Sequence, residues 1–134
     1  MPEATPASGQ SSAPAPTNNA VITARDVSRV FGSGATAVTA VATINLTVEQ
    51  GEYLAVTGRS GSGKTTLLNL LSGLDRPSAG AVFFHGDDIA GMKEADLVDM
   101  RRHKIGFVFQ SFGLMPLLSA QENVELPLHI GGVA

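Results

Sequence analysis

The stretch GRSGSGKTT, residues 58–66, places three glycines, one lysine and several hydroxyl side chains between two apolar runs. It fits the pattern G-x-x-x-x-G-K-[ST], with Gly58, Gly63, Lys64 and Thr65 at the required positions. The sequence predicts a buried strand before it and a helix after it, which is the context of a phosphate-binding loop. A glycine-rich turn before an ordinary core helix is the plainer interpretation, but such a turn requires neither the lysine nor Thr65.

The residue types in this stretch suit a triphosphate. Successive backbone N–H groups can form a concave nest for phosphate oxygens, and the following helix directs its positive end at them. A side chain at Gly61 or Gly63 would obstruct that approach, whereas Lys64 supplies a mobile charge and Thr65 a hydroxyl ligand for Mg²⁺. The predicted nucleotide-binding residues of this run are Gly58, Arg59, Ser60, Gly61, Ser62, Gly63, Lys64, Thr65 and Thr66.

Composition restricts the other possibilities. The formal net charge is −3, so no overall basic field attracts nucleic acid, and we expect no nucleic-acid partner. The chain has no cysteine, which excludes disulfides and thiolate chemistry. Residues 1–20 are rich in proline and small residues and predict a disordered tail, so the predicted domain covers residues 21–134. No apolar stretch approaches the length of a spanning helix.

Hydrophobic patterning predicts alternating strands and helices. Residues 21–30 and the alternating residues 42–48 predict strands, and residues 52–57, apolar on both faces, predict a buried parallel strand. Leucines at helical spacing after residue 66 predict a helix that Gly73 ends in a left-handed cap. An α/β layer fold is the class that such alternation favours.

The second half continues the pattern. Residues 81–85 predict a strand, residues 86–88 a turn, and residues 105–109 a buried strand that ends at Gln110. Residues 93–103 predict an amphipathic helix, with the basic run 101–104 at its solvated end. Within that helix we expect Leu97 and Met100 to face inward and Asp99 and Arg102 to pair at the surface.

Two longer stretches carry a family resemblance: GRSGSGKTTLLNLLSGLDRPSAG and RRHKIGFVFQSFGLMPLLSAQENVELPL. They resemble the ATP-binding subunit of ATP-binding-cassette (ABC) transporters, within the branch of the macrolide-export and lipoprotein-release ATPases. The resemblance covers residues 21–134. It implies an α/β P-loop NTPase fold, of which this chain would form the N-terminal part, an antiparallel β subdomain plus an incomplete parallel core sheet.

The resemblance also implies roles for particular residues. Lys64 and Gln110 would be catalytic, with Thr65 and Gln110 at the Mg²⁺ and Gln110 also at the attacking water. Phe31 would stack on adenine, where the family commonly has tyrosine. Residues 111–118, SFGLMPLL, would contact a transmembrane permease. The residues alone leave plainer alternatives open, because a strand-terminal glutamine is usually a turn residue and Phe31 could be core.

The implied cofactors are ATP and Mg²⁺, and the implied partners are the permease and a second ATPase subunit. The implied location is cytoplasmic, peripheral to the inner membrane through the permease. The family's signature sequence, its Walker B carboxylates and its switch histidine lie downstream of the glutamine loop, and only residues 111–134 follow Gln110 here. We therefore expect these 134 residues to hydrolyse ATP at a rate near zero, to fold marginally and to aggregate through an unpaired strand edge.

Two alternatives remain open at this point. A non-catalytic, vestigial nucleotide-binding fragment would bind the triphosphate without turnover. A GTPase-type switch would use the D-x-x-G pattern at Asp88–Gly91, although the sequence lacks the Asn-Lys-x-Asp motif that recognises guanine.

Overall fold

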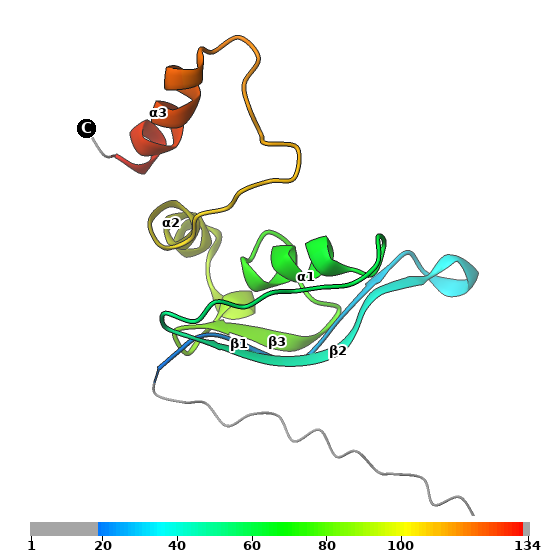
Figure 1. The fold of residues 1–134 in the computed structure, drawn as a ribbon. Coiled ribbons are helices and arrows are strands. Elements are labelled where there is room, and N and C mark those ends of the chain that lie inside the picture. Colours follow the sequence, from blue (N-terminus) through cyan, green and yellow to red (C-terminus); the bar gives the residue numbers. More distant parts are fainter. Residues whose placement is uncertain (1–18, 133–134) are drawn as a thin grey trace, which may run out of the picture. The chain divides into compact units, whose positions relative to one another are not determined.

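The computed structural model describes residues 19–132, in two compact units that divide after Gly91 (Figure 1). The predicted tail, residues 1–20, lies outside the described residues apart from Asn19 and Ala20, and Ala20 already begins the first strand. Among the described residues, no helix combines the length and the apolar character that crossing a membrane requires.

The first unit is built on a four-stranded sheet in the order β2-β1-β3-β4, in which every neighbouring pair is antiparallel. These strands cover the predicted ones at 21–30 and 42–48 and, except for His85, the one at 81–85. The two longest pair along most of their length, from Ala20 opposite Glu49 to Phe31 opposite Val38. The strand bounds are β1 Ala20–Phe31, β2 Val38–Glu49, β3 Ala79–Phe84 and β4 Asp87–Asp88. The predicted turn at 86–88 thus contains a two-residue strand.

One helix, α1 (Lys64–Leu71), packs against β1 and β2 and completes the core of this unit (Figure 1). Gly73 has a φ of 69° and ends the helix in the left-handed conformation, as predicted. Two short 3₁₀ helices, η1 (Gly34–Thr36) and η2 (Ile89–Gly91), join the strands and lead out of the unit. The buried apolar side chains of this unit are Ala24, Val27, Val41, Leu70, Leu71, Val82, Phe84 and Ile89.

Two predicted strands are absent. Residues 52–57 and 105–109 form neither strand nor helix, and their side chains are largely exposed: Tyr53 at 94% and Val108 at 92%. A strand needs a neighbour to satisfy its N–H and C=O groups, and no described residue pairs with either segment in a sheet. Both runs are strand-like in sequence, but the parallel core sheet is not formed among the described residues.

The second unit contains α2 (Glu94–Lys104) and α3 (Ala120–Gly131), which contact each other. Leu97 and Met100 of α2 are buried, as predicted. The predicted surface pair of Asp99 and Arg102 is wrong, because Asp99 lies 3.0 Å from the Nδ1 atom of His103. A histidine four residues on lies on the same helix face, which makes it an equally good neighbour.

The patterning did not predict α3, yet the sequence contains its start signal. Ser119 and Glu122 form a capping box, in which the Ser119 hydroxyl accepts from the Glu122 N–H at 3.3 Å and the Glu122 carboxylate accepts from the Ser119 N–H at 2.7 Å. Pro127 inside the helix disguises the pattern.

Candidate functional site

The glycine loop, defined as residues 58–63, leads directly into α1. Gly61 and Gly63 both have left-handed φ values, 77° and 87°, and Gly63 is the N-cap residue of the helix. Glycine adopts this conformation without the steric cost that other residues pay. The first intrahelical hydrogen bond runs from the Leu67 N–H to the Gly63 carbonyl at 2.8 Å. The N–H groups of the first helical turn therefore point out of the helix end without a carbonyl one turn earlier.

Gly63 also sits against strand β2. A Cβ atom at this position would overlap the carbonyl oxygen of Ala40, whereas a Cβ on Gly61 would have no atom within 4 Å. Only glycine therefore lets the loop lie this close to the strand, and the contact fixes the position of the loop on the sheet.

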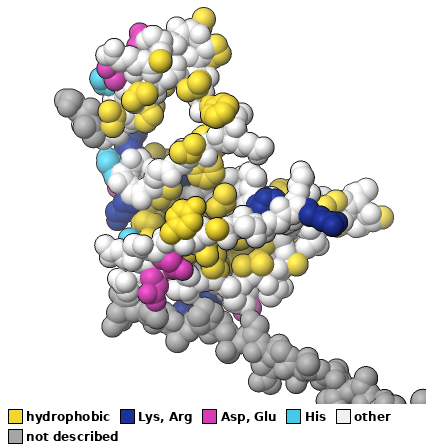
Figure 2. Space-filling view, viewed as in Figure 1, with side chains coloured by type: hydrophobic (Ala, Val, Ile, Leu, Met, Phe, Trp, Pro, Cys, Tyr) yellow, Lys and Arg dark blue, Asp and Glu magenta, His cyan; other side chains and the backbone are white. Residues whose placement is uncertain are grey.

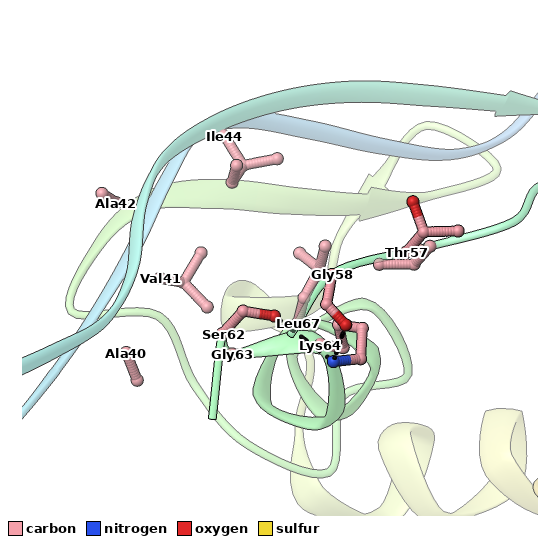
Figure 3. A pocket seen from close by; sticks show the side chains of 11 residues that line it. Ala40, Val41, Ala42, Ile44, Thr57, Gly58, Ser62, Gly63, Lys64 and Leu67 are labelled. Carbon is pink, nitrogen blue, oxygen red and sulfur yellow. Dashed lines mark hydrogen bonds between the residues drawn. The ribbon is translucent and has the colours of Figure 1, made fainter. Parts of the chain in front are cut away.

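The ammonium group of Lys64 forms hydrogen bonds within the glycine loop. Its Nζ atom donates to the carbonyl oxygen of Gly58 at 2.9 Å and to the hydroxyl of Ser62 at 3.3 Å (Figure 3). It also donates to the carbonyl oxygen of Arg59 at 2.7 Å. These bonds use all three ammonium protons. They hold a positive charge next to the Gly58 and Arg59 carbonyls, close to the N-terminus of α1, which is the positive end of the helix dipole.

A cavity of about 270 Å³ lies between the loop and β2 (Figure 3). Its walls combine apolar side chains of β2, such as Val41 and Ile44, with Lys64 and Leu67 of α1. The cavity therefore borders the charged loop on one side and the strand on the other. Thr65 is exposed in the first turn of α1, directly after the lining residue Lys64.

Phe31 is the last residue of β1, and its partner on β2 lies near the residue of β2 that contacts the glycine loop. It pairs with Val38 in the sheet, and Val38 is two residues before Ala40, which touches Gly63. Two residues along a strand span about 7 Å. The ring of Phe31 is 43% exposed, so the interpretation of Phe31 as a core residue is wrong.

The profile of the family described as "ABC transporter" matches residues 41–132, which is more than half of the chain. The chain belongs to the ABC transporter family.

Individual ABC proteins agree with this assignment. The chain is 48% identical over 108 residues to the lipoprotein-releasing system ATP-binding protein LolD of Geobacter metallireducens, a match that covers 81% of this chain and 48% of LolD. It is 45% identical over 114 residues to the macrolide export ATP-binding/permease protein MacB of Marinobacter nauticus, covering 85% of this chain and 18% of MacB. The chain thus spans about half the length of LolD and less of MacB.

Solved ABC structures have the same fold. A dimeric structure of the ATP-binding cassette MJ0796, a protein of Methanocaldococcus jannaschii, bound to ADP and Pi aligns with a TM-score of 0.76 at 40% identity. The alignment covers 82% of this chain and 47% of the cassette. The predicted fold class, an α/β ABC ATPase domain with an antiparallel sheet, is confirmed.

The ABC assignment rules out the GTPase-type interpretation of residues 88–91. Asp88 ends the exposed two-residue strand β4, and its carboxylate accepts a hydrogen bond from the Ala90 N–H at 2.9 Å. The D-x-x-G match therefore belongs to a local turn that leads into η2.

The remaining predicted ABC site residues belong to the second unit. Gln110 is exposed in an irregular segment, and residues 111–117 that follow it are exposed as well. The glycine loop belongs to the first unit, so the predicted part of Gln110 in the site stays a prediction. The carboxylates that follow it in sequence, Glu122 and Glu125, both lie on α3.

Sequence reasoning missed three polar side chains that organise this ABC domain. Arg29 pairs with Asp75 through two hydrogen bonds of 2.9 Å each. Asn123 accepts from the Met115 N–H at 2.7 Å and donates to the carbonyls of Met115, Leu118 and Ser119. Neither arrangement leaves a signal in the hydrophobic pattern, because both join residues that are not neighbours on one helix or strand.

Proposed function

We propose that this chain is the nucleotide-binding part of an ABC transporter ATPase, which binds the triphosphate of ATP at the glycine loop. The observation that carries the proposal is the position of Lys64, whose ammonium group bonds to the Gly58 and Arg59 carbonyls at the N-terminus of α1. A triphosphate would accept these protons in place of the loop carbonyls. The N–H groups of the first turn of α1 would bond to the same phosphate oxygens.

Each residue of the loop has a role in this proposal. Gly58, Gly61 and Gly63 would allow the backbone to approach the phosphates, and the N–H groups of Arg59 and Ser60 would line the nest. The Ser62 N–H, which donates to the Arg59 carbonyl at 3.2 Å, would join them by exchanging that bond for one to phosphate. Lys64, Thr65 and Thr66 form the first turn of the helix, where anions are stabilised by the helix dipole. The full proposed set is Gly58, Arg59, Ser60, Gly61, Ser62, Gly63, Lys64, Thr65 and Thr66.

The base would stack on Phe31. Its ring is partly exposed, and its partner Val38 lies about 7 Å along β2 from the residue that touches the loop. Stacking requires only the face of the ring, so phenylalanine serves as well as tyrosine.

Mg²⁺ would be held by Thr65 together with the phosphates, and the family resemblance assigns Gln110, a residue of the second unit, to the same ion. The ion prefers oxygen ligands, and the Thr65 hydroxyl is exposed in the first turn of α1, which fits such a ligand. When bound, the ion neutralises charge on the phosphate oxygens. The contribution of the chain is to hold the triphosphate in place through the loop amides and Lys64.

The partners follow from the family. Residues 111–118 expose Phe112, Leu114, Met115 and Leu117, an apolar surface that a permease would cover. A second ATPase subunit would complete the assembly, in line with the dimeric state of the MJ0796 cassette. This arrangement would place the chain on the cytoplasmic side of the inner membrane, attached through the permease.

Calorimetric titration with Mg-ATP tests the proposal. We expect Lys64→Ala to weaken binding by at least about tenfold, or ~1.4 kcal/mol, because charge-assisted bonds to phosphate are lost. Lys104→Ala, an exposed lysine at the end of α2, is the matched control and should bind as the wild type does. Unchanged affinity in Lys64→Ala would refute the proposal.

Phosphate release by the same variants separates a catalytic from a non-catalytic role. Glu122 caps α3 and Glu125 accepts from the Gln121 amide at 2.7 Å, so both carboxylates already have partners on α3. We expect these 134 residues to bind ATP without turnover. Release that Lys64→Ala abolishes would show instead that the polypeptide is catalytic by itself.

A further inference from the structure

One face of the Phe31 ring is occupied by a cation. The guanidinium carbon of Arg29 lies 4.5 Å from the ring centroid, while 43% of Phe31 remains exposed. The two residues are two apart on β1, so their side chains project from the same face of the strand. The ring thus has a covered side and an open side.

Arg29 is held firmly in this position. Its Nε and Nη2 atoms donate to the two carboxylate oxygens of Asp75, both at 2.9 Å, and the two side chains are only 25% and 27% exposed. A bidentate pair of this kind fixes the plane of the guanidinium as well as its position. Arg29 can therefore act as a flat, stationary support for the aromatic ring.

Asp75 is in turn attached to the helix that begins at the glycine loop. Its N–H donates to the Asn69 carbonyl of α1 at 3.1 Å, and its Oδ1 atom accepts from the Arg76 N–H at 2.8 Å. The chain of contacts from Phe31 through Arg29 and Asp75 therefore ends on α1. The aromatic ring and the glycine loop are linked to the same helix.

We propose that Arg29, held by Asp75, positions the Phe31 ring so that its open face stacks on the purine base of the bound nucleotide. Both residues are positioning residues that act through Phe31. The inference rests on the proposed nucleotide-binding function. Because Arg29 and Asp75 neutralise each other, the pair adds little net field at the phosphates, and its effect should be confined to the base.

The test compares ATP with inorganic tripolyphosphate, which has the phosphates and no base, by calorimetry. The variant is Arg29→Gln combined with Asp75→Asn, which removes the cation without leaving an unpaired carboxylate. We expect it to weaken ATP binding roughly three- to fivefold, the scale of one exposed cation–ring contact, with unchanged tripolyphosphate binding. Arg29→Lys, which keeps the charge and loses the planar fork, should weaken ATP binding less.

The chain offers a matched control. Arg25 lies 5.0 Å from the ring centroid of Phe83 and so forms a similar stack on the same sheet. Arg25→Gln should bind ATP and tripolyphosphate as the wild type does. Thermal unfolding of every variant identifies those that have lost the fold.

The outcomes divide clearly. Loss of ATP affinity alone in the double variant supports the proposal. Equal loss for ATP and tripolyphosphate, or no loss for either, overturns it, as does an Arg25→Gln variant that behaves like the double variant. A failure of the proposed function would look different, because wild type and Lys64→Ala would then bind tripolyphosphate equally poorly.

Discussion

Gly63 lies so close to Ala40 that a Cβ atom on Gly63 would overlap the Ala40 carbonyl oxygen. The start of α1 therefore lies directly against the backbone of the second strand of the sheet. The loop shape depends on this contact as well as on its own glycines.

Gly63→Ala should destabilise the first unit more than Gly61→Ala does. Both glycines have left-handed φ values, so each alanine costs about 1–2 kcal/mol of strain in the free energy of unfolding. Only Gly63→Ala adds the overlap with β2, which should raise its total to about 3 kcal/mol or more. Chemical denaturation measures both, and equal costs would show that the Ala40 contact is unimportant.

The glycine loop shows what the sequence could predict. The spacing of Gly58, Gly63 and Lys64 indicated a tight turn before a helix, and the structure has that turn and α1. Local chemistry decides such a turn, so it can be inferred from neighbouring residues. The partners of Lys64 within the loop and the approach of Ala40 are tertiary contacts and could not be inferred in this way.

The two missing strands show where the patterning fails. Residues 52–57 and 105–109 are apolar and strand-like, but an apolar run shows only that a segment favours burial. Whether it becomes a strand depends on a partner strand elsewhere. The helix α3 is the opposite case, because the signal at Ser119 and Glu122 was present and the apolar period was masked by Pro127.

Phe31 should contribute to the affinity for ATP and not to the affinity for tripolyphosphate, which has no base. Phe31→Ala removes the stacking surface and should weaken ATP binding by about 1–3 kcal/mol, the usual worth of a base on an aromatic ring. Phe31→Tyr keeps the ring and should retain wild-type affinity. Calorimetry with ATP and with tripolyphosphate checks both, and unchanged ATP affinity in Phe31→Ala would remove Phe31 from the site.

The stability of the first turn of α3 should depend on pH. Hydrogen bonds from the Ser119 hydroxyl and N–H lower the pKa of Glu122 below its ordinary value of 4.5. A carboxylate with a lowered pKa in the folded state stabilises that state above the unfolded value, and the stabilisation disappears as pH falls through the folded value. We therefore expect the first turn of α3 to fray below about pH 4.5.

Amide hydrogen exchange of the Ser119 and Glu122 N–H groups, measured by NMR between roughly pH 3 and 6, reports this fraying. Glu122→Gln retains a capping oxygen that does not titrate, so its protection should be independent of pH in this range. Glu125→Gln is the control, because Glu125 accepts from Gln121 and takes no part in the cap. Its protection should follow the wild-type pH dependence.

Asn123 should hold residues 115–119 against α3. Its side chain accepts from the Met115 N–H and shares its two amide protons among the carbonyls of Met115, Leu118 and Ser119. Asn123→Ala leaves those groups to solvent, so the Met115 N–H should exchange at least about tenfold faster, which corresponds to ~1.4 kcal/mol of lost protection. Gln121→Ala, which removes one exposed bond to Glu125, should leave Met115 unchanged.

The apolar surface of residues 111–118 should drive self-association when no partner covers it. Phe112 is 77% exposed and Leu117 98% exposed, and Figure 2 shows groups of yellow apolar side chains on the visible face of the molecule. Replacing both with serine should lower the light scattering of concentrated samples, because exposed apolar patches promote association. Val124→Ser on α3, a side chain 71% exposed outside this segment, is the control. If Val124→Ser reduces scattering as much as the double replacement does, exposed apolar side chains in general cause the association. That result would contradict the prediction that residues 111–118 are the partner-binding surface.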